Sequence, residues 1–151
     1  MEARLAAARQ TVQESDDLLA MAEKNDFLKG VVGWVDLCDK NCDKDLERLA
    51  KHKKFKGVRH VVQDEPDDNF ILGKAFNEGI KKLAKYDLRY DILIFEKHLK
   101  PSIQFVDQHP KQVFILDHIA KPRIKDRILS PWRENMLELA KRPNVYCKIS
   151  G

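Results

Sequence analysis

The chain has 151 residues, of which 43% are hydrophobic and 34% charged, with 28 basic and 24 acidic side chains and a net charge of +4. This length suits a single domain over residues 1–151, and the composition is that of an ordinary globular protein. No apolar run approaches the roughly 20 residues that span a bilayer, and the first residues lack the apolar core of a secretory signal. We therefore expect a cytoplasmic protein without a membrane partner.

Several other partners and chemistries are also disfavoured. A lysine cluster at residues 51–56 has few aromatic neighbours, so it fits a solvated helix end better than a nucleic-acid surface, and no nucleic-acid partner is expected. Cys38 and Cys42 lack the second ligand pair of a structural zinc site. There is no glycine-rich phosphate loop and no Gly-x-Ser-x-Gly motif, which counts against usual nucleotide binding and against a serine hydrolase.

Helix and strand patterns alternate along the whole chain. The first helix is predicted at residues 4–24, followed by strands at 31–37 and 58–63 with a short helix between them. A helix, a strand at 91–95, another helix, a strand at 112–116, a helix that Ser130 caps, and a strand at 145–149 complete the order.

This alternation indicates parallel βαβ units and an α/β fold of about five strands. Two architectures fit the pattern. One is a doubly wound five-stranded sheet. The other is part of a (β/α)₈ barrel, which in full needs about 250 residues.

The most informative segment is the apolar run at residues 112–116, which ends in Asp117 and His118 and is stopped by Lys121 and Pro122. Chemistry in parallel α/β folds collects at the carboxyl ends of the strands, where loops stay open to solvent. His118 could accept a proton, donate a hydrogen bond or bind a metal. The alternatives are a hydrogen-bonded structural His118, a solvated Lys121 and an Asp117 that caps the next turn.

Other polar residues also fall at predicted strand ends: Arg59, His60 and Gln63 on one strand, and Lys148 and Ser150 on the last. Alternate residues of a strand share a face, so Arg59 and Gln63 should point to one side and His60 to the other. An arginine held at such a place could clamp a carboxylate or polarise a carbonyl through paired donors.

Five segments together resemble one family. They are Gly-Trp-Val-Asp-Leu at residues 33–37, Gly-Val-Arg-His-Val-Val-Gln-Asp-Glu-Pro-Asp at 57–67, Leu-Asp-His-Ile-Ala-Lys-Pro at 116–122, Pro-Trp at 131–132 and Cys-Lys-Ile-Ser-Gly at 147–151. In order and spacing, from about residue 13 to the last residue, the chain resembles the amidohydrolase-related (amidohydrolase 2) family, in its branch of L-fuconolactonase-like sugar-lactone hydrolases.

The resemblance implies a TIM-barrel hydrolase that adds water across the carbonyl of a small lactone or carboxylate substrate. Arg59 matches the family arginine and His118 the later family histidine, so these two are the expected catalytic residues. His60, Gln63 and Glu65 match a motif near the pocket and, with Lys148 from the last strand end, are the expected substrate-binding residues.

The chain also departs from the family pattern. It contains no His-x-His motif, and we expect it to lack the first two and the last barrel strands. No metal ligand is predicted and no cofactor is required by this chain, although zinc or another divalent metal is implied for a full-length protein. Two other hypotheses stay open: a non-catalytic fragment that self-associates through open sheet edges, and a flavodoxin-like sheet that binds a small ligand.

Overall fold

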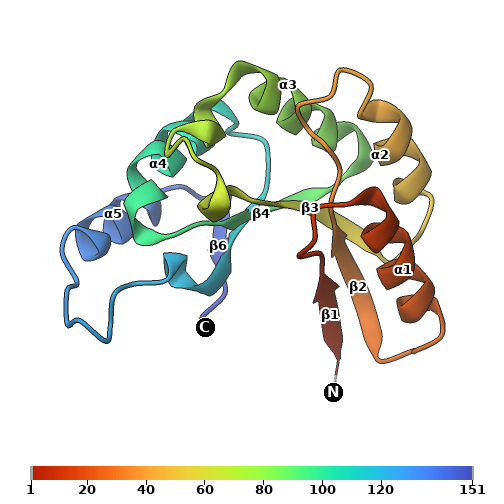
Figure 1. The fold of residues 1–151 in the computed structure, drawn as a ribbon, viewed down its shortest axis with the longest axis horizontal. Coiled ribbons are helices and arrows are strands. Elements are labelled where there is room, and N and C mark those ends of the chain that lie inside the picture. The colour runs from red at the N-terminus through yellow and green to blue at the C-terminus, as the bar shows by residue number, and fades with distance from the viewer. Residues whose placement is uncertain (1, 151) are drawn as a thin grey trace.

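The computed structural model describes residues 2–150, which form six parallel strands with helices between them (Figure 1). The elements are β1 (Ala3–Ala6), α1 (Val12–Glu23), β2 (Leu28–Gly33), α2 (Asp43–Ala50), β3 (Phe55–Val61), α3 (Lys74–Leu83), β4 (Arg89–Leu93), α4 (Leu99–Gln108), β5 (Phe114–Leu116), α5 (Trp132–Leu139) and β6 (Val145–Cys147). Within these residues no helix is long and apolar enough to cross a membrane.

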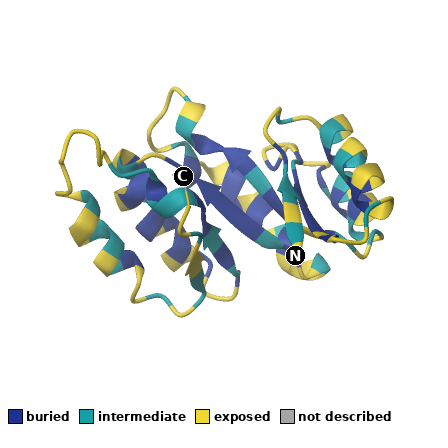
Figure 2. Ribbon diagram, turned by 90° about the horizontal axis from the view of Figure 1, so that it is seen from below, coloured by how far each residue is buried: buried dark blue, intermediate teal, exposed yellow. Residues whose placement is uncertain are grey.

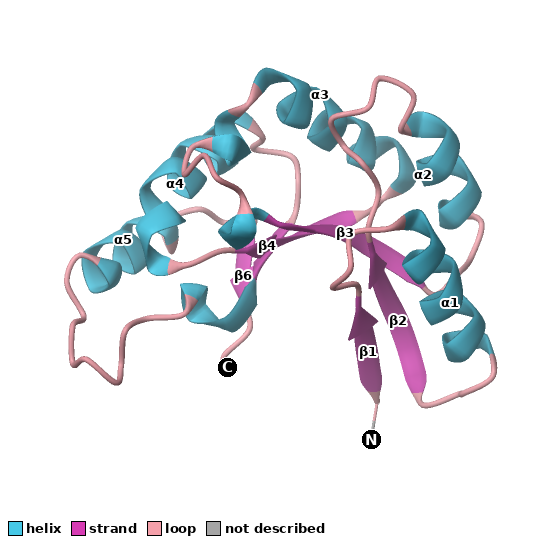
Figure 3. Ribbon diagram, viewed as in Figure 1, coloured by secondary structure: helices cyan, strands magenta, loops and turns pink. Residues whose placement is uncertain are grey.

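The strands lie in the sheet in the order in which they occur in the chain, β1-β2-β3-β4-β5-β6. A doubly wound sheet would reverse its strand order and carry helices on both faces. Here the sheet curls, and the helices follow one another along its outer, convex side (Figure 3). The fold is therefore part of a (β/α)₈ barrel, and the doubly wound and flavodoxin-like alternatives are wrong.

The prediction of a helix from residue 4 is wrong. Residues Ala3–Ala6 form β1, which pairs in parallel with β2, so the sheet has six strands instead of the expected five. The helix begins only at Val12, where the Thr11 side chain accepts a hydrogen bond from the backbone N–H of Glu14. Parallel pairing with β2 outweighs the helical propensity of the alanine-rich start.

Three strands begin and end earlier than predicted. The strands expected at residues 31–37, 58–63 and 91–95 lie at Leu28–Gly33, Phe55–Val61 and Arg89–Leu93. Buried residues that follow these strands, such as Val35 and Val62, extend the apolar pattern into the loops at the barrel mouth. Ser130 was also expected to cap α5, but Pro131 holds that position.

The hydrophobic core lies between the convex side of the sheet and the helices. Phe76, Tyr90, Phe105 and Phe114 are fully buried there, and their rings meet at tilted or edge-on angles with centroids 5.1–6.3 Å apart. Figure 2 shows the buried residues along the strands and the inner sides of the helices, with exposed residues on the outer sides. This packing leaves the concave side of the sheet for polar side chains.

Candidate active site

The polar residues of the concave side gather where the strands end. Arg59 lies near the carboxyl end of β3, Asp117 directly follows β5, and Lys148 directly follows β6. Because the strands are parallel, these ends meet at one edge of the sheet, the edge at which barrel enzymes carry their chemistry.

Arg59 spans the concave side. Its Nε and Nη2 donate to the carbonyl of Ala7, just after β1, and its Nη1 donates to Asp117 Oδ2 over 3.0 Å. A guanidinium has five N–H donors, and three of them make these bonds, so two have no partner among residues 2–150. The guanidinium is thus fixed from two sides and can still donate to a ligand.

Asp117 is fully buried rather than a cap of the following turn. Besides its bond to Arg59, its Oδ1 lies 2.6 Å from Lys148 Nζ. A buried carboxylate is costly unless it is paired, and here two cations from different strands surround it. The ion pairs explain Asp117 without any capping role.

Asp91, in β4, is a site residue that the sequence analysis missed. It is fully buried and its Oδ2 lies 2.5 Å from Lys148 Nζ. Burial raises the pKa of Asp91, against the lowering effect of the hydrogen bond from Lys148. Partial burial works against the charge on Lys148, but its close contacts with the Asp117 and Asp91 carboxylates outweigh this effect and raise the pKa of Lys148.

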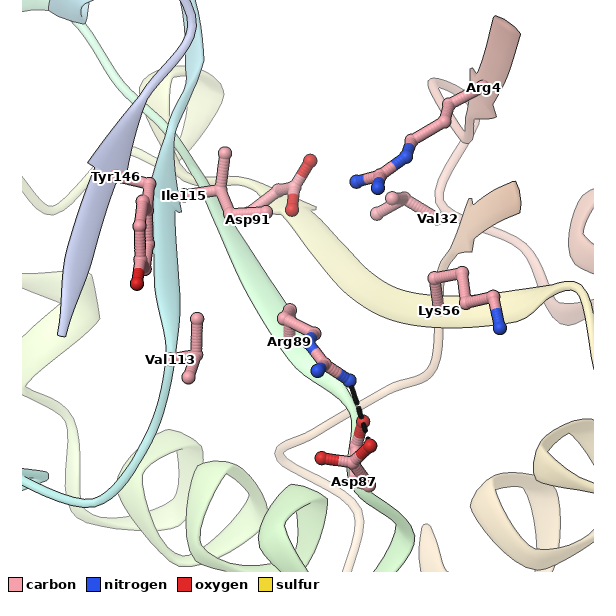
Figure 4. A pocket seen from close by; sticks show the side chains of 9 residues that line it. All are labelled: Arg4, Val32, Lys56, Asp87, Arg89, Asp91, Val113, Ile115 and Tyr146. Atoms are coloured by element: carbon pink, nitrogen blue, oxygen red, sulfur yellow. Dashed lines mark hydrogen bonds and ion pairs between the residues drawn. The ribbon is translucent and has the colours of Figure 1, made fainter. Parts of the chain in front are cut away.

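A cavity of about 510 Å³ opens on the concave side below Arg59. Figure 4 shows the Asp91 carboxylate and the Arg4 guanidinium pointing into it from opposite sides. Arg89 also lines the cavity and is paired with Asp87. The full lining is Arg4, Val32, Lys56, Asp87, Arg89, Asp91, Val113, Ile115 and Tyr146.

His118 is half-buried and begins a run of four left-handed residues. The φ angles of residues 118–121 are 54°, 47°, 57° and 49°, and none of these residues is glycine. Left-handed conformation costs about 1–2 kcal/mol per residue, so the surrounding structure must hold the turn. Trp132 Nε1 donates to the carbonyl of Ile119 over 2.7 Å, and the N–H of Ile119 donates to the carbonyl of Lys148 over 3.2 Å.

The turn also orients the His118 ring. Nδ1 lies 3.0 Å from Ser150 Oγ, while Nε2 has no hydrogen-bond partner among the described residues. If Nδ1–H donates to Ser150, Nε2 carries the lone pair that can accept a proton. Since Asp117 precedes His118 and binds Arg59, the two predicted catalytic residues are linked through one carboxylate.

Gln63 is tied to the same turn. The ammonium of Lys121 donates to Gln63 Oε1 and lies over the ring of Phe95, 5.2 Å from its centroid. Lys121 was expected to be solvated, and this expectation is wrong because these contacts leave it half-buried. The bond joins the loop after β3 to the loop after β5.

His60 and Glu65 lie apart from this group. His60 is buried, its ring is stacked on Phe70 at 4.9 Å, and its Nε2 lies 2.6 Å from Glu65 Oε1. Trp34 Nε1 donates to His60 Nδ1 over 3.2 Å, so Nε2 carries the proton and donates to Glu65. The structure therefore brings Arg59, Gln63, His118 and Lys148 to the concave mouth, and it pairs His60 with Glu65 among aromatic side chains.

The described residues do not form a metal site. Between residues 2 and 150 there is no group of three or more His, Cys, Asp or Glu side chains that could hold an ion. The carboxylates nearest to the mouth, Asp91 and Asp117, are bound by Lys148 and Arg59 instead. A divalent metal does not fit these residues.

Comparison with known proteins gives consistent results. The family model described as "Amidohydrolase" matches residues 2–151. The chain is 36% identical to an L-fucono-1,5-lactonase of Burkholderia ambifaria over 93% of this chain and 49% of that protein. It is also 36% identical to an L-fucono-1,5-lactonase of Burkholderia multivorans over 95% of this chain and 50% of that protein.

Solved structures agree with this result. A crystal structure of an amidohydrolase from Burkholderia multivorans with bound zinc superimposes with a TM-score of 0.91 at 35% identity, over 99% of this chain and 54% of that one. A second crystal structure, with bound HEPES, gives 0.93 at 33% identity with the same coverage. The chain spans about half the length of the curated relatives that it matches. From its motifs, its barrel architecture and these matches, the chain belongs to the amidohydrolase family, in the L-fuconolactonase-like branch.

Proposed function

We propose that the protein takes part in the hydrolytic opening of a sugar lactone. The observation that carries this proposal is the Arg59–Asp117–His118 arrangement at the carboxyl ends of β3 and β5. On the same side of the sheet it presents two guanidinium N–H groups and one imidazole nitrogen that have no hydrogen-bond partner among residues 2–150. The names of the two lactonase relatives support the substrate class.

The chemistry follows from these groups. The oxygen of a water molecule bonds to the lactone carbonyl carbon, the ring C–O bond breaks, and the ring oxygen leaves as a hydroxyl that takes a proton. Arg59 donates to the carbonyl oxygen, on which negative charge develops. His118 Nε2 moves a proton between water and the ring oxygen.

The predicted substrate contacts fall into two groups. Gln63 and Lys148, near the mouth, are the proposed contacts for sugar hydroxyls or a carboxylate. His60 and Glu65 remain predicted contacts, although their mutual pairing favours a supporting role for the loop after β3. The cytoplasm remains the predicted location.

Zinc is a candidate cofactor for a protein of the relatives' length, because one related crystal structure contains it. Residues 2–150 contain no group of three or more His, Cys, Asp or Glu side chains that could hold the ion, and none of the proposed steps involves a metal.

The direct test is the rate of opening of L-fucono-1,5-lactone, followed with a pH indicator and corrected for spontaneous hydrolysis. His118→Ala should lower kcat/KM by about 100-fold, the usual size of a lost acid–base group. His52→Ala is the matched control, because His52 lies in the loop between α2 and β3, at the amino end of β3, and its ring pairs with Glu23. Equal rates for the two variants would remove His118 from the mechanism.

A second candidate function, non-catalytic self-association, is favoured by one observation. β6 is an edge strand whose Tyr146 is 62% exposed, and Ile149 just beyond it is 90% exposed. Unpaired strand edges with apolar side chains are templates for pairing with another chain. The two functions are separated by measuring association and lactone opening on the same sample.

A further inference from the structure

Asp91 has an environment that neither the fold nor the proposed chemistry at the mouth explains. It lies inside β4, it is completely buried, and its Oδ1 has no hydrogen-bond partner among the described residues. Its side chain points to the concave cavity, away from the hydrophobic core (Figure 4). Burial of a carboxylate costs more free energy than burial of an apolar side chain, so a functional role would explain why this position holds an aspartate.

The contacts of Asp91 form a chain of alternating charges that rises to the mouth. Asp91 Oδ2 lies 2.5 Å from Lys148 Nζ, and the same Nζ lies 2.6 Å from Asp117 Oδ1. Asp117 Oδ2 lies 3.0 Å from Arg59 Nη1. Lys148 is thus a bridge between a deep carboxylate and the carboxylate that holds Arg59.

The register of the sheet sets this chain. In the register of the strands, Asp91 of β4 lies beside Arg59 of β3 and beside Ile115 of β5. Asp117 is two residues beyond Ile115, so Asp91 lies one layer of side chains below Asp117. Leu116 pairs with Cys147, and therefore Asp117 and Lys148 leave the sheet at the same level. From this position the Lys148 ammonium reaches both carboxylates.

We propose that Asp91 and Lys148 are positioning residues for Arg59. Together they fix Asp117, and Asp117 then fixes the guanidinium in the orientation that a lactone carbonyl requires; this inference rests on the proposed function. The charged groups around Asp91 are Lys148 and Asp117 from the ends of β6 and β5, Arg59 from β3, Arg89 from β4 itself, and Arg4 across the cavity. Removing the Asp91 charge therefore loosens Lys148 first and Arg59 next.

The kinetic test uses Asp91→Asn, which keeps the shape of the side chain. We expect kcat for lactone opening to fall roughly 10- to 100-fold with little change in KM, as for a misplaced reacting group. The basic limb of the pH–rate profile should move to lower pH, because Lys148 loses one of its carboxylates. Lys148→Arg should retain more activity than Lys148→Met. The control is Asp107→Asn, which removes a surface carboxylate paired with Arg142 and should leave the rate at the wild-type value.

A second measurement does not depend on turnover. The pKa of Lys148, followed by NMR of its ¹³Cε, should fall in Asp91→Asn, and the Arg59 Nε–Hε signal should shift. Wild-type values for both signals would overturn the positioning role, as would wild-type kcat with an unchanged pH profile. If the wild-type protein opens no lactone, the proposed function fails, and the two NMR signals alone then decide whether Asp91 orients Arg59.

Discussion

Arg59 is the residue through which most of the site is connected. Its guanidinium joins the carbonyl of Ala7 to the buried carboxylate of Asp117, and its side chain is only 11% exposed. A lysine could keep the charge but could not bond to both partners, because its single nitrogen lacks the planar fork of donors.

We therefore predict that Arg59→Lys lowers kcat/KM for lactone opening by about 100-fold, the size expected for one lost donor to a developing oxyanion. The matched control is Arg133→Lys, which changes an exposed arginine of α5. Steady-state kinetics on folded samples check this prediction. A rate for Arg59→Lys equal to that of the control would show that the fork of donors is not needed.

Asp91 gives a prediction on stability against pH. Burial raises its pKa above the ordinary value of 3.8, so just above pH 3.8 the folded chain holds a proton that the unfolded chain releases. The protonated Asp91 side chain therefore contributes to the free energy of unfolding at low pH, and this contribution is lost as the pH rises through the raised pKa. Asp91→Asn should therefore gain stability relative to the wild type as the pH rises through this window.

Asp107→Asn provides a control of opposite sign. The hydrogen bond from Arg142 lowers the pKa of Asp107, so its contribution is present above 3.8 and is lost as the pH falls. Urea unfolding at several pH values measures both variants. Differences that run in the same direction for Asp91→Asn and Asp107→Asn would contradict the assignment.

Sequence reasoning identified Arg59, Gln63, His118 and Lys148 as strand-end polar residues, and the structure brings these four to the mouth. Sequence reasoning missed Asp91 because it placed this residue at the start of the predicted strand, where a carboxylate needs no functional explanation. The sequence carried one signal that the strand starts earlier, the aromatic residue Tyr90 directly before Asp91, and the structure buries Tyr90 fully. Ion pairs between residues 57 positions apart, such as Asp91 and Lys148, leave no local pattern.

At the scale of elements, the left-handed turn at residues 118–121 is the feature that the sequence does not disclose. Left-handed Ile119 is especially unfavourable, since a β-branched side chain rarely tolerates positive φ. The motif Asp-His-Ile-Ala-Lys-Pro contains no glycine that would announce such a turn. Contacts from α5 and from the end of β6 hold it in place.

Trp132→Phe should loosen this turn, because it removes the N–H that binds the carbonyl of Ile119 and keeps most of the aromatic volume. We expect a loss of about 1 kcal/mol in the free energy of unfolding and a fall in lactone opening. Chemical denaturation and kinetics on one preparation measure both. Leu137→Ala, at an exposed site of the same helix, should change stability by less than about 0.5 kcal/mol. A Trp132→Phe protein with wild-type stability and turnover would contradict the role of the anchor.

β1 illustrates why the first element was predicted wrongly. Its residues have a helical composition, and only the neighbouring strand β2 supplies the hydrogen-bond partners that make them a strand. The later strands were predicted because each carries several consecutive β-branched or aromatic residues. The order of these strands in the sheet and the curl of the sheet come from long-range pairing.

At the scale of the whole molecule, the curled sheet of residues 2–150 ends in two edge strands, β1 and β6, each of which pairs with a neighbour on one side alone. We predict marginal stability or concentration-dependent association through these edges. Tyr146→Lys should reduce association, because a lysine on an edge strand disfavours pairing with another chain. Leu137→Lys, which replaces a similarly exposed apolar residue on α5, should not.

Size-exclusion chromatography with light scattering, over a wide concentration range, measures the oligomeric state of both variants. A wild-type chain that stays monomeric at all concentrations and melts cooperatively at high temperature would contradict open-edge association.

We propose that the concave mouth around Arg59 and His118 receives the lactone and releases its sugar acid. NMR titration of the protein with the sugar acid from L-fucono-1,5-lactone tests this claim most directly, because it needs no turnover. We predict that the Arg59 Nε–Hε and His118 ring signals shift with ligand, while those of Arg133 and His52 do not. Saturable binding that leaves Arg59 and His118 unchanged, or no binding at millimolar ligand, would contradict it.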